Sequence, residues 1–179
     1  MLYTSSFSEN EIIHYSGLMA AFLKSQREKY SENAEPLPED KREALKPFFS
    51  EAILNTTLFC RVQDEPIQNP DFLTSLHERG VSFALDPLQA VTFIDVIVSY
   101  KPLEPRVQFH ELVHAVQYQK LGLKQFAYKY VKGLLGRGSY DRIPLEVNAR
   151  NLDEAYTKNP AQPFSVDQDV QRWINENKF

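Results

Sequence analysis

Three residues of this 179-residue chain have the types and the spacing that metal chemistry requires: His110, Glu111 and His114, in the sequence HELVH. On an α-helix, residues i and i+4 lie on the same face, so both imidazoles can bind one ion. Glu111 lies about 100° around the helix axis, where its carboxylate can accept a proton from a zinc-activated water. The motif therefore predicts Zn²⁺ as a cofactor, two histidine ligands and Glu111 as a general base.

A catalytic zinc ion needs a third protein ligand and an open fourth position. The extended motif HExxHxxGxxH is absent, because Gln117 and Lys120 occupy the positions of its glycine and its third histidine. We expect the third ligand to be Glu146, an acid beside the inward-facing stripe of a later helix. An acid near a helix start is also favoured by the helix dipole alone. Three other acids remain as alternatives: Asp141, Asp153 and Glu154.

Hydrolysis also needs a hydrogen-bond donor for the developing oxyanion. Tyr140, in the glycine-rich turn 136–142 before the helix of Glu146, is our candidate for this catalytic role. Arg142 is a second candidate, and a Tyr140 that only packs over the turn is the alternative. The other reactive side chains have ordinary interpretations. His14 is predicted on one face of the helix 8–30, and His77 is predicted on the surface, with a role as a hydrogen-bond donor as its alternative. Cys60 is predicted to be a buried, inert thiol.

Four elements must position these residues. The run AVTFIDVIVSY, 90–100, predicts a strand, because β-branched and aromatic residues are frequent in strands. Pro105 can open a helix over 105–121, which Gly122 ends. A second helix is predicted over 124–135, and a third from about Pro144. In the strand, one face is predicted to carry Thr92, Ile94, Val96, Val98 and Tyr100.

The rest of the chain reads as further short elements in an α+β order, helix-rich with a small sheet. We predict a helix over 8–30 with Ser8 as its N-cap, an exposed loop over 31–40, and these further elements: helices 38–49, 70–79 and 167–177, and a strand 56–62. The length predicts a single domain, 1–179. It comprises a helical N-terminal half (1–87), a metal-site core (88–157) and a C-terminal tail helix (158–179).

The composition excludes several classes of protein. The net charge of −4 does not fit a nucleic-acid-binding surface, and a single cysteine excludes an internal disulfide framework. No apolar run approaches the roughly 18 residues needed to cross a bilayer, and the N-terminus lacks the pattern of a secretory signal. We therefore expect a cytoplasmic protein that binds neither nucleic acid nor membrane. The oligomeric state stays open.

The segments QFHELVHAVQYQKLGL and SYDRIPLEVNAR resemble the active-site half of gluzincin-type zinc metallopeptidases. They are most similar to small bacterial HExxH domains that pair HEL-x-H-x-x-Q with a later P-x-E, and the likeness covers about 88–157. It implies a zincin-like fold whose edge strand flanks the active-site helix, with Glu146 as a ligand beside the two histidines. One position departs from the pattern: thermolysin-like members carry an aspartate where this chain has Arg150.

Two functions follow from this resemblance. The first is a zinc metallopeptidase that hydrolyses a peptide or protein substrate, paired along strand 90–100 by β-augmentation. The second is a catalytically inactive zincin-like module that binds a protein or peptide. The intact Glu111 favours the enzyme, whereas Arg150 in place of the supporting aspartate favours the module.

Overall fold

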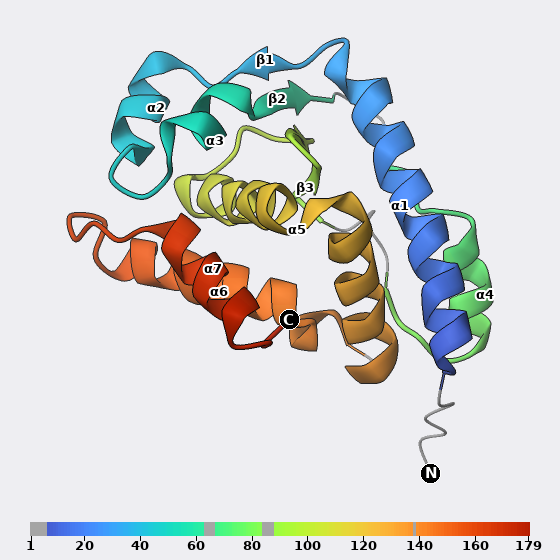
Figure 1. Cartoon of the computed structure of the whole chain (residues 1–179). Helices are drawn as coiled ribbons and strands as arrows, with labels where there is room; N and C mark the ends of the chain where they lie inside the picture. The colour runs from blue at the N-terminus through green and yellow to red at the C-terminus, as the bar shows by residue number, and fades with distance from the viewer. Residues whose placement is uncertain (1–6, 63–66, 84–87, 138) are drawn as a thin grey trace.

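The computed structural model describes residues 7–62, 67–83, 88–137 and 139–179 and has an α+β fold (Figure 1). Its helices are α1 (Glu9–Ser31), α2 (Glu39–Leu45), α3 (Glu51–Thr56), α4 (Phe72–Glu78), α5 (Pro105–Arg137), the 3₁₀-helix η1 (Tyr140–Arg142), α6 (Pro144–Lys158) and α7 (Val166–Asn175). Its strands are β1 (Glu35–Pro36), β2 (Leu58–Arg61), β3 (Ala90–Phe93) and β4 (Val96–Ser99). Within these residues, no helix combines the length and the apolar character needed to span a bilayer.

The four strands form one mixed sheet in the order β1-β2-β4-β3. The β1–β2 and β3–β4 pairs are antiparallel, and the β2–β4 pair is parallel. Strand β3 therefore lies at an edge of the sheet. It packs against helix α5, and the hydroxyl of Thr92 donates a hydrogen bond to Glu111 of that helix. The α+β class, the small sheet and an edge strand beside the helix that carries His110 and His114 agree with the sequence-based prediction.

The prediction of one continuous strand over 90–100 was wrong, because the segment is a hairpin that turns at Ile94 and Asp95. Ile94 has φ 65°, a left-handed conformation that is rare for a β-branched residue. The sequence lacks the Asn-Gly or Asp-Gly pair that marks such turns. Tertiary contacts hold the turn instead: Arg27 forms two hydrogen bonds of 2.8 and 2.9 Å to the carboxylate of Asp95, and the backbone N–H of Leu58 donates to the Asp95 carbonyl.

Helix α5 bends at Gly122, where φ 73° and ψ 159° interrupt the helical conformation. The bend divides α5 into a first arm, residues 105–121, and a second arm, residues 123–137. Figure 1 shows the two arms running in clearly different directions, with the second arm beside α1. The sequence predicted this break, and it allows both arms to face the start of α6.

Helix α6 packs against both arms of α5. On the first arm, Phe109 is fully buried and stacks on Tyr156 with ring centroids 4.4 Å apart. On the second arm, a Cβ added to Gly133 would lie 2.8 Å from Cδ of Pro144, so only glycine permits this close approach. The start of α6, which carries Glu146, is thereby fixed next to α5.

Most of the other predicted elements are present with small changes at their ends. Ser8 caps α1 in a capping box with Glu11, as the sequence indicated. Helix α3 and strand β1 were not predicted, because six and two residues are too few for a periodic pattern. The predicted glycine-rich turn 136–142 includes Gly138, which lies outside the described residues.

Substitution of Gly122 by alanine should lower the free energy of unfolding by about 1–3 kcal/mol, because its backbone conformation is almost exclusive to glycine. The matched control is Gly17→Ala inside α1, where the helical backbone suits alanine and a gain of about 0.5–1 kcal/mol is expected. An added Cβ meets no atom within 4 Å at either site, so backbone strain alone separates the two variants. Urea denaturation measures both, and equal effects would contradict the strained bend.

Candidate metal centre

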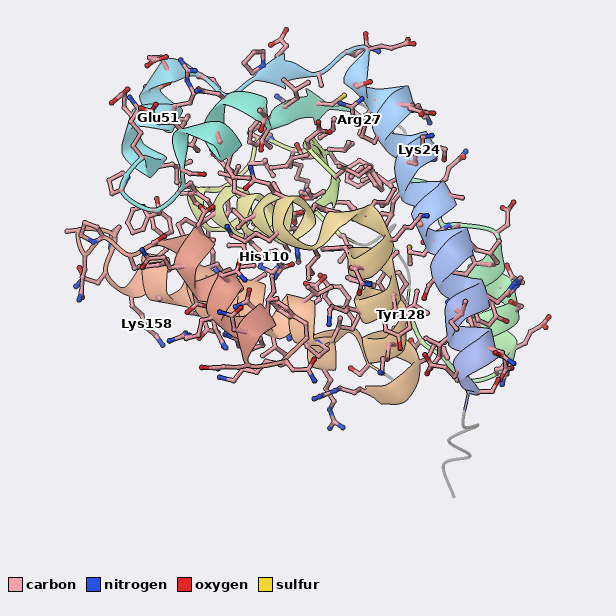
Figure 2. The ribbon with its side chains drawn as sticks, viewed as in Figure 1. Lys24, Arg27, Glu51, His110, Tyr128 and Lys158 are labelled. Atoms are coloured by element: carbon pink, nitrogen blue, oxygen red, sulfur yellow. The ribbon has the colours of Figure 1, made fainter. Side chains whose placement is uncertain are left out.

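Three side chains that are far apart in the sequence bring one ligand atom each to a single point. Nε2 of His110 lies 3.1 Å from Nε2 of His114, and Oε2 of Glu146 lies 3.3 and 3.4 Å from these two nitrogens. All three side chains are at least 88% buried. Figure 2 shows His110 on the first arm of α5, near α6. The group could hold a metal ion.

The spacing of the three atoms suits a small tetrahedral ion. Ligands at about 2.0–2.1 Å from a tetrahedral zinc ion lie about 3.3–3.4 Å from one another. The observed separations of 3.1, 3.3 and 3.4 Å match this triangle. The chemistry of the donors also fits, since two imidazoles and one carboxylate are ligands that zinc accepts at catalytic sites.

Asp153 orients His110. Its Oδ2 accepts a hydrogen bond of 2.8 Å from Nδ1 of the ring, and its Oδ1 accepts one of 2.7 Å from Nε of Arg106. Because a carboxylate only accepts, Nδ1 of His110 must carry the proton, which leaves the Nε2 lone pair for a metal. Asp153 is thus a partner of His110, a candidate ligand, and is not one of the three candidate ligands. It takes the supporting role that the resemblance assigned to the position of Arg150.

The sequence predicted Asp153 only as an alternative third ligand, although its spacing from Glu146 indicates a supporting position. Positions i and i+7 of a helix lie on nearly the same face, so Asp153 stands two turns along α6 on the side of Glu146. Arg150, four residues after Glu146, binds elsewhere: its guanidinium contacts the carboxylate and the backbone carbonyl of Asp141. The side chain of Asp141 is 82% exposed, so the alternative third ligand lies outside the cluster.

His114 is supported by an amide where His110 is supported by a carboxylate. Its Nδ1 lies 2.9 Å from Oε1 of Gln117, one turn further along α5. In the sequence, Gln117 is both a departure from the extended motif and the glutamine of HEL-x-H-x-x-Q, and neither pattern predicted its contact with His114. Its position three residues after the second histidine, on the same face, was the available signal.

Two tyrosine hydroxyls donate to the carboxylate of Glu146. Tyr130, on the second arm of α5, lies 3.0 Å from Oε1, and Tyr140, in η1, lies 2.8 Å from Oε2. Burial and the negative charge of Glu146 raise the pKa of both phenols, so both stay protonated donors. Tyr140 therefore reaches the centre, as predicted. The other candidate donor, Arg142, is exposed.

The two histidines and Glu146 shift one another's pKa values toward their charged forms. Burial acts to lower the pKa of His110, but its hydrogen bonds to Asp153 and Glu146 outweigh burial and raise the pKa to about 10. Burial likewise opposes the charge of His114, and Glu146 raises the pKa of its ring. For Glu146, burial is outweighed by the two imidazoles, which hold its pKa well below the usual range. Without a metal, the histidines hold protons where a cation would bind.

Glu111 lines the same cavity as His114 and Glu146. This cavity is lined by Glu111, His114, Glu146, Tyr140 and apolar side chains of α1, β3 and α5. The hydroxyl of Thr92 lies 2.6 Å from Oε2 of Glu111. No lysine or arginine among the described residues forms an ion pair with Glu111. Thr92 was predicted only as a strand residue, because its contact with Glu111 arises from tertiary packing.

His14 lies on α1, His77 at the surface and Cys60 in a strand, as predicted. His14 and His77 are exposed, and Nε2 of His77 contacts the carbonyl of Phe83. Cys60 is buried in β2, and burial raises the pKa of its thiol, as expected for an inert cysteine. In comparisons with protein families, curated proteins and solved structures, the chain matches none.

Replacement of Asp153 by asparagine should weaken zinc binding by about tenfold to a hundredfold, because a side-chain amide cannot accept from both His110 and Arg106. The matched control is Glu154→Gln, which removes the adjacent, half-exposed carboxylate near Arg106. Competition with a chromophoric chelator measures both affinities. Equal affinities in the two variants would show that Asp153 does not support the ligand.

The pH should act oppositely on the metal-free and the zinc-bound protein. In the metal-free protein, the raised pKa of His110 contributes stability that is complete below pH 6.5 and is lost as the pH rises through about 10. Zinc requires deprotonated imidazoles, so its binding should strengthen over that range. The increase in Tm on adding zinc to chelator-treated protein should therefore be larger at pH 8.5 than at pH 6. An equal increase at both pH values would contradict the assignment.

Proposed function

We propose that the protein is a zinc-dependent metallopeptidase with a zincin-like arrangement of its active-site helix and edge strand. The observation that carries the proposal is the convergence of His110, His114 and Glu146 on one point, with Glu111 lining the cavity beside His114 and Glu146. A structural metal site would not require a second carboxylate, that of Glu111, beside its three ligands. The resemblance of residues 88–157 to gluzincins leads to the same activity.

Each step of the proposed hydrolysis is assigned to zinc or to a residue of the centre. When bound, zinc would polarise the scissile carbonyl and lower the pKa of a water molecule at its open position. Glu111 would accept the proton of the attacking water and deliver it to the leaving amine. The hydroxyl of Thr92 is bonded to Oε2 of Glu111, so Oε1 is the oxygen left to take that proton.

Tyr140 is proposed to have two roles. In the structure, its single hydroxyl proton is donated to Oε2 of Glu146, so Tyr140 positions a ligand. Its hydroxyl also lies at the cavity that contains Glu111, where a developing oxyanion would form. Stabilisation of the oxyanion would require this proton to leave Glu146, whose second oxygen keeps the hydrogen bond from Tyr130.

The substrate is proposed to be a peptide or an extended protein segment. Strand β3 has β4 as its neighbour and no strand on its other side among the described residues. A peptide added along that edge would form backbone hydrogen bonds that do not depend on its sequence. Thr92 belongs to the same strand, so the peptide would lie close to Glu111.

One observation favours the second candidate, an inactive zincin-like binding module. The cavity beside the ligand atoms has a volume of about 50 Å³ and is lined mostly by apolar side chains, including Phe83, Phe93 and Phe126. Such a cavity holds one or a few water molecules. A peptide side chain could enter only if these residues move, which peptidase activity would require.

Replacement of Glu111 by glutamine should keep the zinc affinity within about twofold and reduce peptide hydrolysis by about 10²–10⁴-fold, because it removes the proton acceptor and leaves the ligands in place. His114→Ala should lose both properties, because it removes a ligand. A fluorogenic peptide library measures hydrolysis, and chelator competition measures zinc.

The outcomes separate the two candidates. If Glu111→Gln cleaves as fast as the wild type, Glu111 is not the general base. If the wild type binds zinc tightly and cleaves no peptide of the library, the binding module replaces the peptidase as the proposed function.

A further inference from the structure

We propose that Gln117 is a positioning residue that determines which nitrogen His114 presents to the metal, and that α7 anchors it through Asn148 and Asp169. This inference rests on the metal centre of the proposed function. It concerns a directed series of hydrogen bonds that runs from the surface of α7, through α6, to the second histidine of α5.

The direction of the series is set at Asp169 of α7. A carboxylate only accepts hydrogen bonds, so Nδ2 of Asn148 must be the atom that donates to Oδ1 of Asp169, at 3.0 Å. The side-chain amide of Asn148 therefore cannot be reversed without losing this bond. Its Oδ1 is turned toward Gln117 as an acceptor.

The orientation of Gln117 follows. Its Nε2 lies 3.0 Å from Oδ1 of Asn148 and 3.0 Å from the backbone carbonyl of Leu145. Both partners are acceptors, so the amide nitrogen must face them and Oε1 must face His114. Nδ1 of His114 then carries the proton of the 2.9 Å bond to Oε1, and Nε2 is left with its lone pair.

Burial makes this orientation costly to change. Gln117 and Asn148 are both fully buried, and their side-chain atoms have the partners just described. Reversal of either amide would place donors against donors or acceptors against acceptors away from water. A buried polar group without a hydrogen-bond partner is strongly unfavourable, so one orientation dominates.

As a consequence, the Nε2 atoms of His110 and His114 face each other. Asp153 fixes the proton of His110 on Nδ1, and Gln117 does the same for His114. When both rings are neutral, as metal binding requires, the two Nε2 atoms are bare acceptors 3.1 Å apart. Two such atoms repel unless a cation lies between them and Glu146, so the series prepares the centre for a metal ion.

The test compares two glutamines of the same helix. Gln117→Met keeps the length of the side chain and removes the acceptor for His114, so zinc should bind about 10–100-fold more weakly. Gln108→Met is the matched control, because Gln108 is also buried in α5 and its Nε2 has no hydrogen-bond partner among the described residues. Chelator competition should give the control the wild-type affinity.

A spectroscopic readout separates positioning from loss of stability. In the zinc-loaded, ¹⁵N-labelled wild type, we expect a hydrogen-bonded Nδ1–H signal from the ring of His114, which should be absent from zinc-loaded Gln117→Met. Asn148→Leu is a second variant, away from the metal. It leaves only the carbonyl of Leu145 to orient Gln117, so its loss of affinity should lie between those of the control and of Gln117→Met.

Each result either supports or overturns the proposed role of Gln117. Weaker zinc binding and loss of the His114 signal in Gln117→Met, with an unchanged control, support the proposal. Wild-type affinity in Gln117→Met, or an equal loss in Gln108→Met, overturns it while the metal centre stands. If Gln117→Met does not fold, wild-type affinity and an unchanged signal in Asn148→Leu overturn it. A wild-type protein that binds no zinc removes the metal centre and this inference together.

Discussion

The structure depends on keeping one carboxylate charged inside the protein. Glu146 is 97% buried, and an isolated buried carboxylate would be strongly destabilising. Its partners come from three places: histidines on the first arm of α5, Tyr130 on the second arm and Tyr140 in η1. Both arms can reach Glu146 because α5 bends at Gly122, and α6 can approach them because position 133 carries no side chain.

The parts of the site that depend on local geometry could be predicted from the sequence. The pairing of His110 with His114 follows from the helical repeat, and Gly122 marks the end of the first arm. Glu146 could be predicted because an acid beside an inward-facing stripe needs a partner. Hydrogen bonds between distant segments could not be predicted in this way. Thr92 meets Glu111 only after β3 has packed on α5, and no pattern within either segment indicates it.

The hairpin of β3 and β4 shows why one strand was expected where two exist. The run 90–99 contains the residues that strands favour, and its turn contains Ile94, which local preference would exclude. Contacts from α1 and β2 outweigh that preference: Arg27 binds Asp95 from 68 positions away, and Leu58 holds its carbonyl. The same turn makes β3 an edge strand, which places Thr92 beside Glu111.

The charges around the centre explain why the ligand set suits a divalent cation. Arg106 pairs with Asp153, so that carboxylate is balanced within the protein. Glu146 and Glu111 have no lysine or arginine partner among the described residues, and both are more than 90% buried. Gln117 supports His114 without adding a third negative charge. Two uncompensated carboxylates beside two neutral imidazoles leave a deficit of two positive charges, which either two imidazole protons or one divalent ion can supply. Proton and metal therefore compete for the same lone pairs.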